Sequence, residues 1–352
     1  MDSDDDYSTL DNFTPRVCEI NHDFMYRKGL CGLKNLGNTC FMNSILQCLN
    51  STPDLVKFIF SDEFYEHLNK NKLEYSLIAE WKKVSRFLWY KNATYIPINF
   101  VRTLQRISIA KDNPQFTGFG QNDSQEFLQF MLECVHNCLA RNVEIKTIGE
   151  PTTDYDRMAH TACVEFKQFF ENDYSKIIDI FYGQFYSNVE TITEGKTEES
   201  QTFNPFNMLS LAIPEGASDI YECLDNFTKN ETILDDDEKK IYKKVRFWTL
   251  PSVLIIFMKR YNNEGEKINT HIRFPVDELD MSKYVCGYNK GSYKYSLQSI
   301  SNHGGGLMGG HHWSYIKNAD SKWYKYNDHV VSTIAPCDVV SPAAYCLFYV
   351  RK

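Results

Sequence analysis

Cys40 occupies a position at which a cysteine can act as a nucleophile. Asn38 or Thr39 can cap a helix that begins at Cys40, and Gly37 lies in the loop before it. The free N–H groups of a helix N-terminus favour the thiolate, which is the attacking form of cysteine, so we expect a lowered thiol pKa there. A small buried side chain is the alternative for any of the eleven cysteines. It is the better interpretation for Cys48, Cys134, Cys138, Cys223 and Cys346.

His311 is the candidate general base, and it follows a glycine-rich stretch, residues 304–310. This stretch satisfies Gly-x-Gly-x-x-Gly, but the pattern binds dinucleotides only where it opens a helix. Residues 312–315 alternate like a strand instead, and no Gly-Lys-Ser/Thr follows to make a phosphate loop. Two interpretations remain. The stretch is a flexible hairpin tip with an incidental histidine, or a mobile loop beside an active site with His311 as the base.

Asn327 and Asp328 follow at the end of a short predicted strand, residues 323–327. An imidazole base works best when a third group accepts its other N–H, because that bond fixes the tautomer and the orientation of the ring. Either residue could accept this N–H. In a regular strand the two side chains point to opposite faces, so only one of them would reach His311 directly. A turn that merely ends the strand is the alternative for both.

The composition of the chain excludes some partners and indicates a location. The chain has 352 residues, 43% of them apolar, with a formal net charge of −8 and no basic cluster, which argues against nucleic acid as a partner. The longest apolar run, residues 253–258, is far shorter than a membrane span. The first residues are acidic, unlike a secretory signal, and the number of cysteines is odd. We therefore expect reduced thiols and a cytoplasmic or nuclear location.

Predicted helices come first along the chain and predicted strands second. After the helix from Cys40, apolar periodicity predicts helical segments near residues 77–88 and 100–107, and a longer helix after Gly120. Beyond about residue 160 the period approaches two. Strands are predicted over residues 180–189, 206–213, 244–258, 293–301, 312–317, 323–327 and 345–350, with one helix at 219–227. This order predicts an α+β fold with a largely antiparallel sheet.

Five blocks of the sequence, in order, resemble blocks of the ubiquitin-specific proteases. Gly32–Ser44 resembles the Cys box of this family, and Gly309–Tyr315 with Trp323–Asp328 resembles its His box. Gly120–Phe127 resembles the Gln-Asp block between them, and Leu250–Tyr261 and Ala344–Arg351 resemble two later blocks. The resemblance extends from about Gly29 to the C-terminus, and five blocks in register make a chance match implausible.

The resemblance implies a papain-like cysteine protease hand with a helical thumb, an antiparallel β palm and short β fingers. Residues 1–28 would be an acidic, flexible extension and residues 29–352 the catalytic domain, with the thumb at about 29–160 and the palm and fingers at about 161–352. Many relatives bind one zinc ion in the fingers through two Cys-x-x-Cys pairs, but no such pair occurs in this chain. We expect no structural zinc, no cofactor and a shortened second finger hairpin.

The resemblance also implies roles for the residues of the candidate triad. Cys40 would be the nucleophile and His311 its base, which takes the thiol proton and later protonates the leaving amine. Asn327 matches the residue that orients the histidine, and Asp328 is a neighbour that could share this task. Asn35 matches the asparagine that stabilises the oxyanion, where the loss of one donor typically costs about 10²–10³ in turnover.

Three further positions concern the substrate. Asp123 and Glu126 match acidic residues that, in relatives, meet the basic C-terminal tail of ubiquitin. The alternative for this pair is a capping box, in which Asp at the N-cap and Glu three residues later satisfy N–H groups of the helix. His312 replaces the tyrosine that usually follows the catalytic histidine, which concerns the wall of the substrate groove.

The resemblance implies a thiol-dependent deubiquitinase. It would hydrolyse peptide and isopeptide bonds at the C-terminal glycine of ubiquitin through a Cys40 thioester. Ubiquitin and ubiquitinated proteins would be its partners, together with an activating or targeting protein. The alternatives are a protease for another ubiquitin-like modifier and a catalytically silent ubiquitin-binding module. An intact set of Cys40, His311, Asn327 and Asn35 argues against the silent module.

Overall fold

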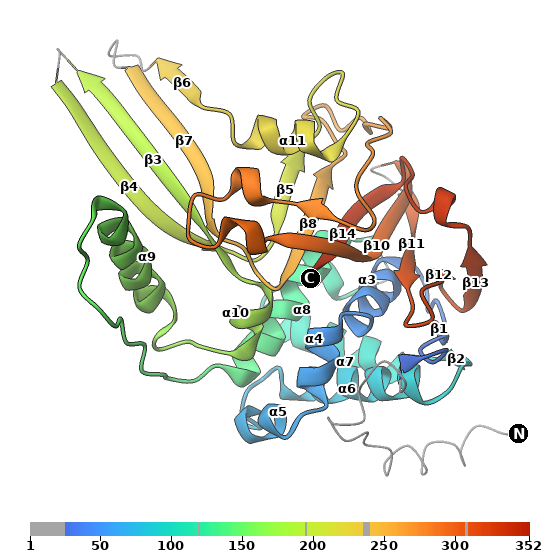
Figure 1. Cartoon of the computed structure of the whole chain (residues 1–352). Helices are drawn as coiled ribbons and strands as arrows, with labels where there is room; N and C mark the ends of the chain where they lie inside the picture. The colour runs from blue at the N-terminus through green and yellow to red at the C-terminus, as the bar shows by residue number, and fades with distance from the viewer. Residues whose placement is uncertain (1–24, 119, 194–195, 235–239, 307–308) are drawn as a thin grey trace, which may run out of the picture. The chain divides into compact units, whose positions relative to one another are not determined.

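A computed structural model describes residues 25–118, 120–193, 196–234, 240–306 and 309–352 (Figure 1). The chain divides into two compact units. The first unit contains residues up to Ala140, Tyr261–Asn269 and Gln298–Phe348, and the second contains Arg141–Arg260, Thr270–Leu297 and Tyr349–Lys352. The predicted extension, residues 1–28, lies almost entirely outside the described residues. The predicted limits of thumb, palm and fingers remain predictions.

The first unit is built around helix α3 (Cys40–Asn50), which begins at the predicted residue and is buried along its whole length. It packs against α8 (Ser124–Leu139), the long helix predicted after Gly120, and also against strand β11 (Gly309–Lys317). The other elements before α8 are β1 (Gly32–Leu33), α4 (Pro53–Ile59), α5 (Asp62–His67), α6 (Tyr75–Tyr90), β2 (Thr94–Tyr95), α7 (Ile98–Ala110) and η2 (Pro114–Phe116). Most of the buried side chains of α3 are apolar or small, and the buried amides of Asn43 and Gln47 are hydrogen-bonded.

Antiparallel strands form the other half of this unit. β10 (Lys294–Gly306, with residues from Gln298 in this unit), β11, β12 (Trp323–Asn327) and β13 (Val330–Ile334) pair in that order. The register places His303 opposite His312 and Gly304 opposite His311. Since directly opposed residues share a face of the sheet, His303 and His312 lie on one face and His311 on the other. η5 (Pro336–Asp338) and the first residues of β14 (Ala344–Arg351) complete the unit.

The second unit contains a four-stranded sheet, in the order β4 (Lys196–Phe206), β3 (Gly183–Thr193), β7 (Lys240–Thr249) and β6 (Glu231–Leu234). The β3–β4 pairing runs from Gly183↔Phe206 to Thr193↔Lys196, whereas β6 and β7 pair only over Glu231–Leu234. Among the described residues the second hairpin is paired over fewer positions than the first; the expectation that it is shortened relative to the family remains a prediction. Helix α9 (Asp154–Phe170) packs on β4, where Ala162, Tyr186, Phe203 and Trp248 form a core.

The other elements of the second unit are α10, β5, α11, β8 and β9 with two short 3-10 helices. Their bounds are α10 (Lys176–Phe181), β5 (Leu209–Ala212), α11 (Ile220–Phe227), β8 (Val253–Lys259), β9 (Leu279–Asp280), η3 (Ser282–Tyr284) and η4 (Lys290–Ser292). β5 runs parallel to β8, and β9 pairs with the first residues of β10. α11 carries a capping box of Asp219 and Glu222, which agrees with the helix predicted there.

Two predicted strands are wrong in detail, and two elements were not predicted. The strand predicted from residue 180 begins only at Gly183, because residues 180 and 181 end helix α10. Residues 244–258 form two strands, because Leu250-Pro251-Ser252 separates β7 from β8 and a proline cannot donate to the ladder. Strand β4 was not expected, since its outer residues, Thr197 to Gln201, are polar and exposed. Helix α9 was not expected either, because only Ala162 and Phe170 of its seventeen residues are buried and the segment is polar on average.

Candidate active site

Cys40 is the first residue of α3, and it is only 4% exposed. Thr39 precedes it as the N-cap residue but makes no capping hydrogen bond through its side chain, contrary to the prediction. The pKa of the Cys40 thiol is raised, mainly by burial and further by the charge of Asp328. The N–H groups of His312, Phe41 and Cys40 itself act in the opposite direction. The predicted lowering of this pKa is therefore wrong for the unliganded site, because desolvation outweighs the helix N-terminus.

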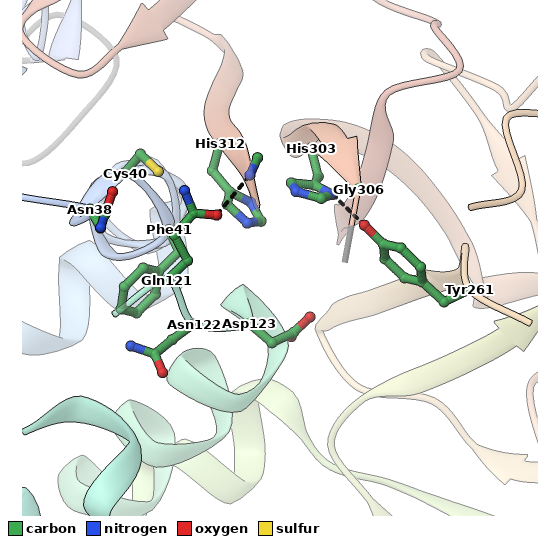
Figure 2. Close-up of a pocket in the computed structure, with 11 residues that line it drawn as sticks. Asn38, Cys40, Phe41, Gln121, Asn122, Asp123, Tyr261, His303, Gly306 and His312 are labelled. Atoms are coloured by element: carbon green, nitrogen blue, oxygen red, sulfur yellow. Dashed lines mark hydrogen bonds between the residues drawn. The ribbon is translucent and has the colours of Figure 1, made fainter. Parts of the chain in front are cut away.

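A cleft of about 200 Å³ adjoins Cys40. Its walls come from the start of α3, the loop before α8, the β10–β11 hairpin and Tyr261 (Figure 2). All of these segments belong to the first unit. At the hairpin, the N–H of Gly310 donates to Oε1 of Gln121 at 2.7 Å, so the loop before α8 is tied to strand β11. Residues 307 and 308 of the glycine-rich stretch lie outside the described residues.

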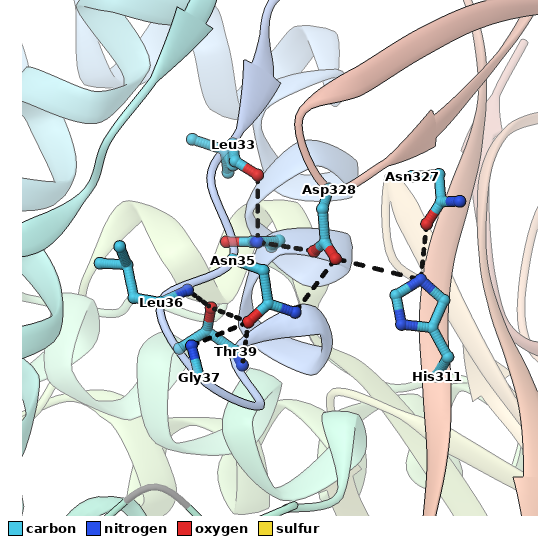
Figure 3. Close-up of polar contacts among 9 residues, drawn as sticks. Leu33, Asn35, Leu36, Gly37, Thr39, His311, Asn327 and Asp328 are labelled. Atoms are coloured by element: carbon cyan, nitrogen blue, oxygen red, sulfur yellow. Dashed lines mark hydrogen bonds and ion pairs between the residues drawn. The ribbon is translucent and has the colours of Figure 1, made fainter.

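The ring of His311 is fixed by Asn327. The distance from Nε2 to Oδ1 of Asn327 is 2.5 Å (Figure 3). Because an amide oxygen only accepts, Nε2 carries the proton and Nδ1 keeps a free lone pair. A lone pair on Nδ1 is what a base for the Cys40 thiol requires. Among the described residues no hydrogen bond joins Cys40 to His311, although α3 packs against β11.

Asp328 lies on the same side of His311 as Asn327. Its Oδ2 is 4.0 Å from Nε2 of His311, too long for a hydrogen bond but short enough for an ionic interaction with an imidazolium. Alternation in a regular strand would have sent it to the other face, but β12 ends at Asn327 and Asp328 has φ 51°. This left-handed residue turns the chain, so the structure brings both candidates to His311 and gives the direct bond to Asn327.

Two amides hold the carboxylate of Asp328. Nδ2 of Asn43 donates to Oδ1 at 2.8 Å, and Nδ2 of Asn35 donates to Oδ2 at 3.0 Å (Figure 3). Asn43 was not singled out from the sequence. Its position three residues after Cys40 places it on the first turn of the same helix, and that spacing could have indicated a role near the nucleophile.

Asn35 organises the loop that leads into α3. Its Oδ1 accepts the backbone N–H of Gly37 at 3.0 Å and that of Thr39 at 3.2 Å. These bonds hold a turn in which Gly37 has φ 106° and Asn38 has φ 53°. One N–H of its amide is directed at Asp328, which leaves the second N–H of the same group. The role of Asn35 in stabilising the oxyanion remains a prediction.

Asp123 is the N-cap residue of α8 and also lines the cleft. Its Oδ1 accepts the N–H of Gln125 at 2.6 Å and of Glu126 at 3.4 Å, and its Oδ2 accepts the hydroxyl of Tyr345 at 2.5 Å. The cap thus forms, but in the part of the chain described here Glu126 does not complete a capping box, and its side chain is exposed. Contact of Asp123 and Glu126 with a substrate tail remains a prediction.

Two further histidines form a wall of the cleft. The rings of His303 and His312 are stacked, with centroids 4.5 Å apart and planes at 27°. Burial, with smaller contributions from neighbouring charges such as Lys267, lowers the pKa of His303 to about 4 and that of His312 to about 3. Both rings are therefore neutral at pH 7. The sequence indicated His312 as a departure from the family, but the partner ring of His303 is evident only from the strand register.

Within the described ranges, no group of three or more His, Cys, Asp or Glu side chains is arranged to hold a metal ion. The described cysteines are all free of disulfides. No helix in these ranges has the length and apolarity needed to cross a bilayer. The expectation that the chain needs no structural zinc remains a prediction.

Known proteins match this chain along most of its length. The family description "Ubiquitin carboxyl-terminal hydrolase" matches residues 31–349. Ubiquitin carboxyl-terminal hydrolase 2 of Bos taurus is 32% identical over 92% of this chain and 55% of its own length. The protein of that name from Gallus gallus is 33% identical over 92% of this chain and 93% of its own length. The chain thus spans about half of the bovine relative.

Solved structures agree with this match. A chain of the SAGA DUB module of Ubp8, Sgf11, Sus1 and Sgf73, bound to monoubiquitin, is similar with a TM-score of 0.71 at 26% identity, over 93% of this chain and 70% of that chain. The same module bound to ubiquitin aldehyde gives a TM-score of 0.69 at 26% identity, over the same shares of the two chains. The predicted α+β, papain-like fold is confirmed. The resemblance of the sequence is confirmed too, and the chain belongs to the ubiquitin carboxyl-terminal hydrolases of the ubiquitin-specific protease type.

Proposed function

We propose that this chain is a thiol-dependent deubiquitinase that hydrolyses peptide and isopeptide bonds at the C-terminal glycine of ubiquitin. One observation supports this most directly. Asn327 fixes His311 with Nδ1 unprotonated, on a strand packed against the helix that begins with Cys40, and a cleft ends at that cysteine. The relatives supply the substrate class by name, and one solved neighbour holds ubiquitin aldehyde.

The reaction begins with transfer of the Cys40 proton to Nδ1 of His311. The thiolate attacks the carbonyl carbon of the terminal glycine, and the carbonyl oxygen becomes an oxyanion near Asn35. When the C–N bond breaks, the leaving amine takes the proton from Nδ1, and a thioester remains on Cys40. Water then attacks the thioester while Nδ1 of His311 takes its proton, the C–S bond breaks, and the thiolate of Cys40 takes that proton back. The products are a ubiquitin carboxylate and the free thiol.

Burial of Cys40 makes the base indispensable. Because desolvation raises its pKa, the isolated thiol holds less thiolate at neutral pH than a free cysteine does. The approach of an imidazole that can take the proton offsets this cost. The charge of Asp328, 4.0 Å from Nε2, then stabilises the imidazolium that forms.

Ubiquitin and ubiquitinated proteins are the proposed partners. An activating or targeting protein is proposed as well, since the solved neighbours contain Ubp8 together with Sgf11, Sus1 and Sgf73. Location in the cytoplasm or the nucleus is proposed on the cysteine content alone.

The test is covalent capture by ubiquitin that carries a C-terminal electrophile, read by intact mass, with Cys40→Ala beside it. We expect the mass of one ubiquitin to be added to the wild-type chain and nothing to be added to the variant. If only a probe made from a ubiquitin-like modifier is captured, that modifier and not ubiquitin is the substrate. If no probe is captured but ubiquitin still binds in a pull-down, the proposed enzymatic activity is wrong and the chain is a ubiquitin-binding module.

A further inference from the structure

We propose that Lys267 is a positioning residue that keeps His303 neutral with its proton on Nε2, so that Nε2–H is a fixed donor in the cleft for a backbone carbonyl of the substrate tail. The proposal rests on the proposed function for the identity of the tail. The state of His303 itself follows from contacts within the first unit and can be tested separately.

Lys267 reaches His303 at two atoms. Its Nζ donates to the backbone oxygen of His303 at 2.8 Å and lies 3.4 Å from Nδ1 of the ring. The hydroxyl of Tyr261 is 3.1 Å from the same Nδ1. A β-bridge between Tyr261 and Lys267 holds the two ends of this loop together. The lysine is thus fixed by the loop and by the backbone of β10, independently of the ring.

The chemistry of lysine decides the tautomer. An ammonium group has three donors and no acceptor, so the ring atom it faces must be the unprotonated one. The hydroxyl of Tyr261 can donate or accept, and it does not decide the matter. With Nδ1 as the acceptor, a neutral His303 carries its proton on Nε2.

The charges around His303 keep it neutral. The charge of Lys267 disfavours a second positive charge on the ring, and the ring is also desolvated. From β11, His312 stacks on the ring and His311 adds a smaller repulsion when it is protonated. The carboxylate of Asp123, before α8, acts in the opposite direction but is already bound by Tyr345 and by the helix N–H groups. Tyr345 of β14 contributes an uncharged ring.

Nε2 of His303 lies beside Gly310 in the wall of the cleft. It lies so close to Gly310 that a Cβ on that residue would clash with Nε2, and also with the backbone oxygen of Gly304 at 2.6 Å. His303 and Gly310 both line the cleft, and the N–H of Gly310 is occupied by Gln121. The ring N–H is therefore a donor held beside glycine backbone. An extended peptide without side chains presents carbonyl oxygens to such a wall, and a carbonyl is the acceptor that this donor fits.

Loss of Lys267 would remove the preference for one tautomer. With the proton on Nδ1, the lone pair of Nε2 would face a substrate carbonyl, so two acceptors would oppose each other. The ring would also protonate more readily as the pH falls. Both changes affect binding of the tail rather than proton transfer at His311.

The experiment measures the tautomer and the kinetics in the full chain. Histidine labelled with ¹⁵N reports the state of each ring nitrogen by NMR, with His303→Gln to assign the signals. In the wild type at pH 7 we expect Nε2 protonated and Nδ1 unprotonated. Lys267→Met should lose this pattern, Lys267→Arg should keep it, and Tyr261→Phe should keep it too. With ubiquitin carrying a fluorogenic C-terminal amide, Lys267→Met should raise KM about tenfold with kcat unchanged.

Lys322→Met is the matched control, because it removes an exposed lysine of the same unit that does not line the cleft. Its tautomer signals and its KM should equal those of the wild type. A wild-type His303 with its proton on Nδ1, or a Lys267→Met variant with unchanged tautomer and KM, would overturn the proposal. Tautomer loss in Tyr261→Phe but not in Lys267→Met would transfer the role to Tyr261. If the wild type does not cleave ubiquitin, the proposed function fails, and the NMR result still decides the role of Lys267.

Discussion

Two sides of Cys40 use histidine in opposite ways. On the side of His311, which we call the triad side, the side chain is 43% exposed and an amide oxygen holds Nε2. On the side of His303 and His312, which we call the cleft side, the rings are stacked and buried, and an ammonium group faces Nδ1 of His303. When neutral, His311 and His303 both carry the proton on Nε2, but their neighbours have opposite charges.

The difference follows from what each ring must do. A base gains and loses a proton in every turnover, so its surroundings must tolerate the imidazolium. Exposure and the carboxylate of Asp328 at 4.0 Å provide that tolerance on the triad side. A wall that only binds must not change its charge, and burial together with Lys267 prevents this on the cleft side. Substitutions on the two sides should therefore alter different quantities.

The largest effect is expected on the triad side, for His311→Ala. Without the base, kcat should fall by about 10²–10⁴, since burial raises the pKa of the thiol and no imidazole would take its proton. KM should change little, because the cleft side is intact. Steady-state kinetics with a fluorogenic ubiquitin substrate measure both constants. His160→Ala, an exposed histidine of α9, is the control and should behave as the wild type. A large change in KM with normal kcat would place His311 on the binding side.

On the triad side, substitutions of Asn327 and Asp328 should have different effects on kcat and Tm. Asn327→Ala removes the direct acceptor of His311, and we expect kcat to fall by roughly 10² with little change in Tm. Asp328→Ala should lower both kcat and Tm, because the amides of Asn35 and Asn43 lose their partner at a cost of about 1–3 kcal/mol. Kinetics and thermal melts of the two variants make the comparison. Near-normal turnover in Asn327→Ala, with none in Asp328→Ala, would assign the orienting role to Asp328.

On the cleft side, two roles of Asp123 can be tested separately: the cap of α8 and the negative charge in the cleft. Asp123→Ala removes the cap of α8, which costs about 1 kcal/mol of stability, and also removes the carboxylate from the cleft. Asp123→Asn keeps a good cap and removes only the charge. We expect both variants to bind ubiquitin several-fold more weakly and only Asp123→Ala to melt earlier. Titration with ubiquitin in a Cys40→Ala background gives the affinity. A lower Tm with unchanged affinity would leave only the cap.

The sequence anticipated the triad side better than the cleft side. Cys40, His311 and Asn327 belong to short motifs, so their types and neighbours indicate a role before the fold is known. The meeting of His303 with His312 depends on the register of β10 against β11, and that of Tyr345 with Asp123 joins residues 222 positions apart. Neither contact has a local signal. The side chain of Asp328 lies near His311 because the backbone of Asp328 itself is left-handed, and the alternation of a regular strand does not predict this.

The fold shows the same limit. Helix α3 and strand β12 match their predictions, since each has a strong local pattern and a clear end. Helix α9 buries only two residues, and the outer half of β4 is polar, so both elements depend on their neighbours for stability. Tertiary contacts decide such segments, and a single sequence does not contain them.

The smallest effect concerns acid stability, and it should arise on the cleft side. The pKa of His312 is about 3 in the folded chain and about 6.5 when unfolded, so between these values the unfolded state binds more protons. Stability should therefore fall as the pH drops below about 6.5, by about 1 kcal/mol at pH 5.5 for this residue. His312→Met cannot titrate, and its loss of Tm between pH 7.5 and pH 5.5 should be smaller by on the order of 2 °C.

The difference between the two pH values is the useful quantity, because any packing defect of His312→Met acts equally at both. His160→Ala is again the matched control, because it removes an exposed histidine of α9 that does not line the cleft. An equal pH dependence in the wild type and His312→Met would mean that His312 protonates as readily in the folded chain as in the unfolded one. The cleft side would then not be held uncharged, and this difference from the triad side would be lost.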